Sequence, residues 1–124
     1  MRETSSGTHN QAVGHYGEQV AARHLSGLGL RVLDRNWRCD AGEIDLVLRE
    51  GSTLVVCEVK TRFGSRPEAP HEAVTDTKLE RLRLLGERWQ EARGVRAPDV
   101  RVDLVAVVLP GRGAPRVDHV RGIG

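Results

Sequence analysis

Two strand-like segments separated by one short turn constrain the fold of this 124-residue chain more than any other feature. Residues 43–48 (EIDLVL) begin with polar and apolar side chains in alternation, and residues 53–61 (TLVVCEVKT) are rich in β-branched side chains. Both patterns are typical of β-strands. The intervening Glu50-Gly51-Ser52 is a turn signal of hairpin length. We therefore predict that these two strands form an antiparallel hairpin.

The remaining elements follow from hydrophobic periodicity and from the glycines and prolines that end each pattern. Helices are predicted over residues 13–26 and 72–93. Further strands are predicted over 30–37 and 100–109, with a short edge strand at 116–120. The order α-β-β-β-α-β, with this last short strand, favours an α/β fold in which helices flank a mixed central sheet.

One domain is expected, because a chain of this length fits a single hydrophobic core and no linker interrupts the pattern. We predict the domain over residues 13–120, between a disordered polar tail at 1–12 and a C-terminal tail at 121–124. The sequence has no run of about 18 apolar residues. It also has no apolar signal segment at its start, so a cytoplasmic protein without a membrane partner is expected.

Ionisable residues interrupt both hairpin strands, although the strands otherwise read as core. Side chains alternate between faces, so Glu58 and Lys60 share one face of their strand. Glu43 and Asp45 share a face of the partner strand for the same reason. If residues 50–53 form the turn, Asp45 lies opposite Glu58, and Glu43 lies opposite Lys60. Opposed carboxylates repel and burial raises their pKa values, which a divalent cation such as Mg²⁺ would relieve.

The same residues also allow a different interpretation. An antiparallel sheet can expose one face to water, and the four ionisable side chains could then form a salt-linked outer surface. Two features weigh against this interpretation. Residues 54–57, before Glu58, are apolar on both faces as in a central strand, and the carboxylates bracket one tight turn.

Lysine usage singles out two positions. Of 19 basic residues only Lys60 and Lys78 are lysines, and the others are arginines. An ammonium is compact and its pKa shifts readily, whereas a guanidinium is planar and always charged. In a chain that otherwise uses arginine, these two lysines are therefore candidates for a task that arginine performs badly.

Several motifs carry a resemblance to known families. Gly-Glu-Ile-Asp (42–45), followed by Val-Val-Cys-Glu-Val-Lys-Thr-Arg (55–62), resembles the PD-(D/E)xK nuclease signature. A wider series over about residues 14–110 resembles the YraN family of small uncharacterised bacterial proteins, which is similar in sequence to archaeal Holliday-junction resolvases. That series is Gly17-Glu18 with Ala21, Arg35-Asn36-Trp37-Arg38, Gly42-Glu43-Ile44-Asp45, Glu58-Val59-Lys60-Thr61-Arg62, Glu72-Ala73-Val74 with Lys78, and Arg101-Val102-Asp103.

The resemblance implies a restriction-endonuclease-like fold with a Mg²⁺ or Mn²⁺ site. Asp45 and Glu58 match the metal-binding carboxylates, and Lys60 matches the catalytic lysine. Glu18 matches a first-helix glutamate that joins the metal site in resolvase-like members, although an ordinary helix-edge glutamate is an equal alternative. The chain departs from the pattern at Cys57, where an aromatic residue is common, and at Ile44, which replaces the proline before the aspartate.

Other residues receive supporting roles. We predict that Glu43 holds Lys60 in a salt link, and that Asp103 is a structural or supporting residue on the neighbouring strand. The residues expected to contact the phosphates of nucleic acid are Arg62 and Arg66 of the loop 62–70, together with Lys78.

Two functions follow. The first is a divalent-metal-dependent endonuclease acting on DNA, with branched or damaged DNA as the substrate and a two-fold homodimer as the resolvase-like assembly. The second is a module on the same fold that binds nucleic acid or protein without cleaving it. The formal net charge of only +2 is compatible with either.

Overall fold

The computed structural model describes residues 2–64 and 75–123, with side chains described from residue 11 onward. The elements in chain order are α1 (Arg2–Gly27), β1 (Arg31–Cys39), β2 (Gly42–Glu50), β3 (Thr53–Phe63), α2 (Asp76–Arg93), β4 (Asp99–Leu109) and β5 (Arg116–Val120). The predicted α/β class is confirmed, and so is the short edge strand at 116–120. Within the described residues, no helix combines the length and the apolar composition that a membrane span requires.

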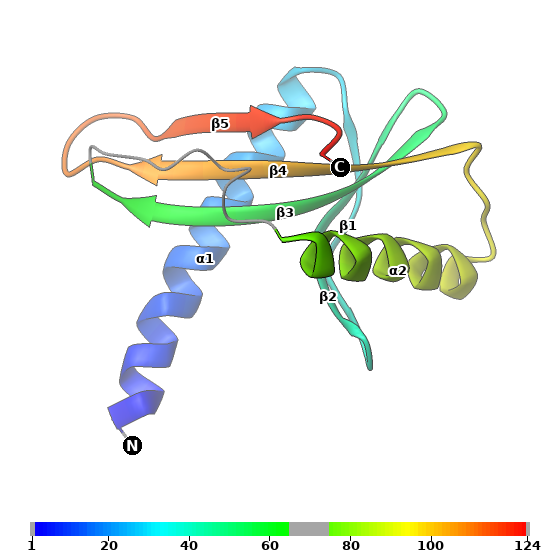
Figure 1. The fold of residues 1–124 in the computed structure, drawn as a ribbon. Coiled ribbons are helices and arrows are strands. Elements are labelled where there is room, and N and C mark those ends of the chain that lie inside the picture. Colours follow the sequence, from blue (N-terminus) through cyan, green and yellow to red (C-terminus); the bar gives the residue numbers. More distant parts are fainter. Residues whose placement is uncertain (1, 65–74, 124) are drawn as a thin grey trace.

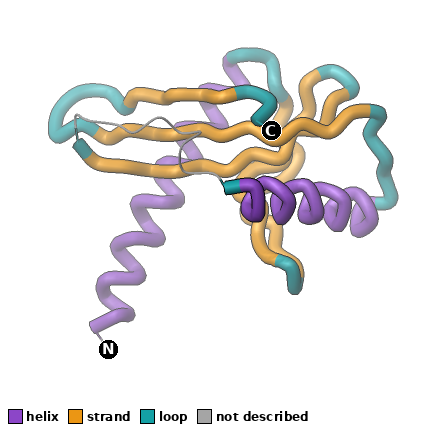
Figure 2. The backbone as a smooth tube through the Cα atoms, in the orientation of Figure 1, coloured by secondary structure: helices purple, strands orange, loops and turns teal. Residues whose placement is uncertain are grey.

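The five strands form one mixed sheet in the order β1-β2-β3-β4-β5. Neighbouring strands are antiparallel except for β3 and β4, which run parallel. A parallel pair needs a long crossover connection, and α2 lies within it. The helices cover opposite faces of the sheet, with α1 behind it in Figure 1 and α2 in front. Figure 2 shows that loops lie at the ends of the strands.

The alternation of β3 divides the core into two layers. Val55 and Cys57 pack on the α1 side, and Leu54 and Val56 pack on the α2 side. The residues that α1 contributes to its layer are Ala21, Ala22 and Leu25. Those that α2 contributes are Leu79, Leu82, Leu85 and Trp89. The face that α2 buries is therefore formed by apolar residues spaced three and four apart.

Two element boundaries differ markedly from the sequence predictions, and a third cannot be compared. Helix α1 continues back to Arg2, through the segment 1–12 that we expected to be a disordered tail. That segment contains no proline, so nothing in it stops a helix that is already formed downstream. Strand β3 extends to Phe63, into the predicted loop. The predicted start of the second helix, at residue 72, lies outside the described residues, and α2 is described from Asp76.

Helix α1 lies unusually close to β3. A Cβ atom at Gly17 would be 1.8 Å from the Thr61 hydroxyl oxygen, a distance that no real pair of atoms tolerates. Glycine is therefore required at this contact, because any side chain would push the helix away from the sheet. The close approach brings the next residue, Glu18, to the edge of the sheet.

Candidate functional site

The candidate site lies where β2 separates from β3. The two strands pair from Glu50 with Thr53 to Leu46 with Cys57, in the register that the sequence predicted. The ladder then ends, so the expected pairs Asp45 with Glu58 and Glu43 with Lys60 do not form. In Figure 1 the turn end of β1 and β2 projects below the sheet while β3 continues along it. The strong twist of the hairpin opens the sheet at this point.

Asp45 occupies the opening. Its Oδ2 accepts a hydrogen bond from the backbone N–H of Val59 at 2.8 Å, in place of a backbone ladder bond. Ile44 packs on the α2 side of the sheet, whereas Leu46 packs on the α1 side. In a regular strand these two residues, which are two positions apart, would point to the same face. They point to opposite layers instead, so the alternation of the strand is interrupted at Asp45.

The neighbouring strand, β1, is irregular beside Asp45. Asn36 of β1 has a φ of 52°, and it is the only residue other than glycine with a positive φ in the described chain. The pairs Arg35 with Leu46 and Trp37 with Ile44 are formed on either side of it, but Asn36 and Asp45 do not pair. Asparagine tolerates this left-handed conformation better than most residues. Its carboxamide is therefore directed out of the ladder, toward α1.

The electrostatics of Asp45 are unfavourable for a carboxylate. Its pKa is raised to about 7, mainly by burial and further by the nearby carboxylates of Glu18, Glu58 and Glu43, against the opposing effect of the Val59 hydrogen bond. Several negative groups converge here around one mostly buried acid. Such a cluster favours a proton or a cation at Asp45.

Glu58 has a cation in contact. The ammonium of Lys78, from the first turn of α2, forms an ion pair with its carboxylate, and the two side chains are 30% and 16% exposed respectively. Lys60, the predicted catalytic lysine, is exposed on β3, and within the described part of the chain it has no ion pair. The predicted salt link between Lys60 and Glu43 is not formed, because Glu43 pairs with Arg38 instead (Nε–Oε1 3.7 Å).

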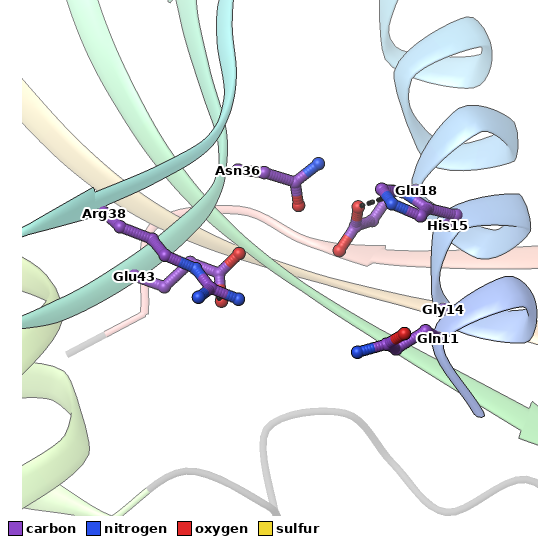
Figure 3. A pocket seen from close by; sticks show the side chains of 7 residues that line it. All are labelled: Gln11, Gly14, His15, Glu18, Asn36, Arg38 and Glu43. Carbon is purple, nitrogen blue, oxygen red and sulfur yellow. Dashed lines mark ion pairs between the residues drawn. The ribbon is translucent and has the colours of Figure 1, made fainter. Parts of the chain in front are cut away.

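Glu18 reaches the same region from α1. Burial raises its pKa, and a hydrogen bond with the Asn36 side chain opposes that shift. It also lies 3.7 Å from Nδ1 of His15. Figure 3 shows these side chains facing one another across a cavity of about 390 Å³ between α1 and the β1–β2 hairpin. The residues that line it are Gln11, Gly14, His15, Glu18, Asn36, Arg38 and Glu43.

The predicted metal ligands are only partly brought together. Among the described residues, no group of three or more histidine, cysteine, aspartate and glutamate side chains is arranged to hold a metal ion. Glu18, Asp45 and Glu58 therefore do not form a closed three-carboxylate set. Asp45 and Glu58 remain a fitting pair of oxygen ligands, because Mg²⁺ is usually held by one or two carboxylates and keeps several waters. Burial and the repulsion of nearby carboxylates together raise the pKa of Asp45, and such a cation would offset both.

Asp103 lies apart from this site. It is fully buried on β4, in register with Cys57, so alternation places it on the α1 face, opposite to Glu58. Its carboxylate accepts hydrogen bonds from Arg101 at 2.9 and 3.1 Å and from the Gly122 N–H at 2.9 Å, and lies 2.8 Å from His119 Nε2. This network joins β4 to β5 and to the C-terminal segment, and it does not contact Asp45 or Glu58.

The residues predicted to contact phosphate are scattered in what the structure describes. Arg62 is partly buried near the end of β3, and Arg66 lies outside the described residues. Lys78 lies in the carboxylate cluster itself. Asn36 was not among the predicted site residues, although its motif was noted. A motif asparagine in the middle of a predicted strand was the available signal, since asparagine disfavours strands and tolerates positive φ.

Comparison with known proteins finds one matching family and many similar bacterial proteins. The model of the "Uncharacterised protein family UPF0102" matches residues 17–107, a span that includes Glu18, Asp45, Glu58 and Lys60. A UPF0102 protein of Nocardioides sp. is 60% identical over 124 residues, which cover 100% of both chains. A UPF0102 protein of Streptomyces coelicolor is 59% identical over 114 residues, covering 90% of this chain and 88% of that one. None of these names states an activity or a ligand.

Proposed function

We propose that this chain, which belongs to the UPF0102 family, is a divalent-metal-dependent endonuclease that hydrolyses DNA phosphodiester bonds. The proposed cofactor is Mg²⁺ or Mn²⁺, and the proposed substrate is branched or damaged DNA, bound by a two-fold homodimer. The resemblance of residues 42–62 to the PD-(D/E)xK signature supports this class of enzyme. The observation that carries the proposal is the position of Asp45, at the opening between β2 and β3, with Glu58 and its partner Lys78 beside it.

Each residue of the cluster has a role in this proposal. Asp45 and Glu58 hold the metal, and the Val59 N–H keeps the Asp45 carboxylate oriented toward the opening. When bound, the metal supplies Lewis-acid stabilisation of the phosphoryl group and a more acidic water. Lys60, two residues after Glu58 and on the same face, stabilises the negative charge that develops on the phosphate. Glu18 and Asn36 line the adjoining cavity, where the nucleotide next to the cleaved bond would lie.

A non-catalytic binding module on the same fold is the second candidate. One observation favours it: Lys78 already neutralises Glu58, so this carboxylate is satisfied without a metal. The missing third ligand among the described residues points in the same direction. In this case the protein would bind nucleic acid or protein equally well in the presence of a metal chelator.

Cleavage of defined DNA substrates tests the proposal. The purified protein is incubated with a labelled four-way junction, a flap, a duplex and a single strand, in Mn²⁺ or in EDTA. We expect cleavage in Mn²⁺ alone, abolished by Glu58→Ala and by Lys60→Ala, and the preferred substrate would identify the class of DNA. Glu91→Ala is the matched control, because Glu91 is an exposed glutamate near the far end of α2. Folded protein that binds Mn²⁺ but cleaves none of the four substrates would contradict the proposal.

A further inference from the structure

We infer that Lys78 is the counter-ion of Glu58 in the metal-free protein, and that a divalent metal displaces it and so frees its ammonium for the substrate phosphate. This inference rests on the proposed nuclease function and adds a second lysine to that site. It assigns to one side chain both the neutralisation of Glu58 and a contact with DNA.

The first observation is the ion pair itself. The Lys78 ammonium contacts a Glu58 oxygen, and both side chains are largely removed from water, at 30% and 16% exposure. Glu58 is close enough to Asp45 for its negative charge to help raise the pKa of that aspartate. A carboxylate in these surroundings needs a cation, and Lys78 provides one. A metal bound to Glu58 would compete with the ammonium for the same carboxylate.

The second observation is the way in which Lys78 is attached. Its backbone N–H donates to the Thr75 hydroxyl at 3.2 Å, which caps the first turn of α2, and the next residue, Leu79, is buried in the core. The backbone of Lys78 is therefore held in place. Its ammonium, in contrast, stands on a flexible four-carbon stem and can change partner without any movement of the helix.

The third observation is the type of cation. Every other ion pair between a carboxylate and a lysine or arginine in the described chain uses arginine, as in the pairs of Arg88 with Asp40 and of Arg101 with Asp103. The planar guanidinium forms fork-shaped, geometrically defined pairs, whereas an ammonium is a point charge. The chain thus departs from its usual choice at the carboxylate that a metal would need. A permanent structural ion pair could use arginine like the others. An ion pair that must exchange its carboxylate for another partner is better formed by lysine.

Metal binding measured by thermal unfolding tests the displacement. The melting temperature of the full-length protein is followed during a Mn²⁺ titration for the wild type, Lys78→Met, Lys78→Arg and Glu58→Gln. We expect the Mn²⁺ concentration at half-saturation to fall by roughly tenfold or more in Lys78→Met, because a competing charge at contact distance is removed. Lys78→Arg should bind Mn²⁺ more weakly than Lys78→Met, and Glu58→Gln should show no comparable response.

The matched control is Arg88→Met. It removes another ion pair of α2, between Arg88 and Asp40 at 3.0 Å, without touching the carboxylate cluster. We expect it to leave the Mn²⁺ half-saturation unchanged. Equal half-saturation in the wild type and Lys78→Met, in a protein that still cleaves DNA, would overturn the inference and leave the nuclease proposal standing. Absence of any Mn²⁺ response that depends on Glu58 would overturn both.

DNA binding tests the second half of the inference. Fluorescence anisotropy with a labelled four-way junction is measured in the Lys60→Ala background, so that the substrate stays intact. Adding Lys78→Met should weaken binding several-fold in Mn²⁺, where the ammonium is released to the phosphate, but should have little effect in EDTA, where Glu58 holds it. A loss of affinity that is equal under the two conditions would show that Lys78 does not exchange partners.

Discussion

Asp45 and Asp103 are aspartates of one sheet, the first partly buried and the second fully buried, and their surroundings are opposite. Asp103 is surrounded by donors: Arg101, His119 and the Gly122 N–H all contact its carboxylate. Burial would raise its pKa, but these hydrogen bonds outweigh burial and lower the pKa below the usual aspartate value. Asp45 has one backbone donor and three neighbouring carboxylates, and its pKa is raised to about 7.

The difference separates an acid that stabilises the fold from one whose ionisation destabilises it. A buried carboxylate with a full set of donors gains from the folded state and contributes to its stability. A carboxylate crowded by others lowers the stability of the folded state when it ionises, and such crowding is enriched at functional sites of proteins. Residue type does not distinguish the two aspartates, whereas their burial and their partners do.

The largest effect is expected when the satisfied aspartate is removed. Asp103→Ala leaves the guanidinium of Arg101 and the His119 ring without their buried partner, so we expect the free energy of unfolding to fall by about 3–5 kcal/mol. Urea denaturation measures this change. The exposed pair of Arg116 and Asp118, at 3.3 Å, gives the matched control: Asp118→Ala should cost less than about 1 kcal/mol. Similar losses in the two variants would mean that the Asp103 network adds little.

Removing the charge of Asp45 should raise the free energy of unfolding rather than lower it. Asp45 has a raised folded-state pKa, so its ionisation destabilises the fold as pH rises from about 4 toward 7, and the loss is complete above pH 7. Asp45→Asn, which can still accept from Val59, should therefore stabilise the metal-free protein by about 2–4 kcal/mol at pH 8 and by little at pH 4. Urea denaturation in EDTA at the two pH values measures both. A destabilised Asp45→Asn at pH 8 would refute the charge repulsion.

A smaller effect is expected from loss of the last residues. The predicted C-terminal tail is attached to the sheet: Gly122 donates to Asp103, Arg121 pairs with Glu50 at 2.6 Å, and the Ile123 N–H donates to the Val102 carbonyl at 2.9 Å. Deletion of residues 121–124 should lower the free energy of unfolding by about 1–3 kcal/mol. It should leave Mn²⁺ binding at Asp45 unchanged, which a parallel titration would check. A change in metal affinity would show that the two aspartates are coupled.

The smallest effect is the pH dependence of metal binding itself. A metal at Asp45 must replace the proton that this carboxyl group holds below its pKa of about 7. Mn²⁺ affinity should therefore rise by up to about tenfold per pH unit below pH 7 and level off above it. Calorimetric titration at pH 5.5, 6.5 and 8 would measure the slope. Affinity independent of pH would indicate that the metal bypasses Asp45.

The sequence was sufficient for the features that depend on local pattern. The helix and strand types, the hairpin and its register between residues 46 and 57 followed from alternation and from the length of one turn. These features are local because a hairpin register is set by residues close in the chain. The same reasoning predicted Asp45 opposite Glu58, but the ladder ends one pair earlier, at Leu46 and Cys57.

The partners of those carboxylates were not foreseen. Lys78 reaches Glu58 because the first turn of α2 lies near β3, and Arg38 displaces Lys60 as the partner of Glu43 because the strands separate after Leu46. Likewise, the structural role favoured for Asp103 depends on His119 and Gly122, which β5 and the C-terminal segment bring to it. Each of these contacts is set by the packing of elements far apart in the chain, which periodicity does not encode.

Cys57 gives the chain a built-in reporter of motion at the site. Its thiol is fully buried, burial raises its pKa well above the usual value, and it occupies the last rung before β2 and β3 separate. A thiol reagent can therefore modify it only when the hairpin opens, while the more accessible Cys39 reacts from the closed state. The ratio of the two labelling rates measures how often β2 separates from β3, starting from the end at which Asp45 and Glu58 lie. Any ligand that bridges the opening should slow the labelling of Cys57, and no engineered probe is needed to measure this.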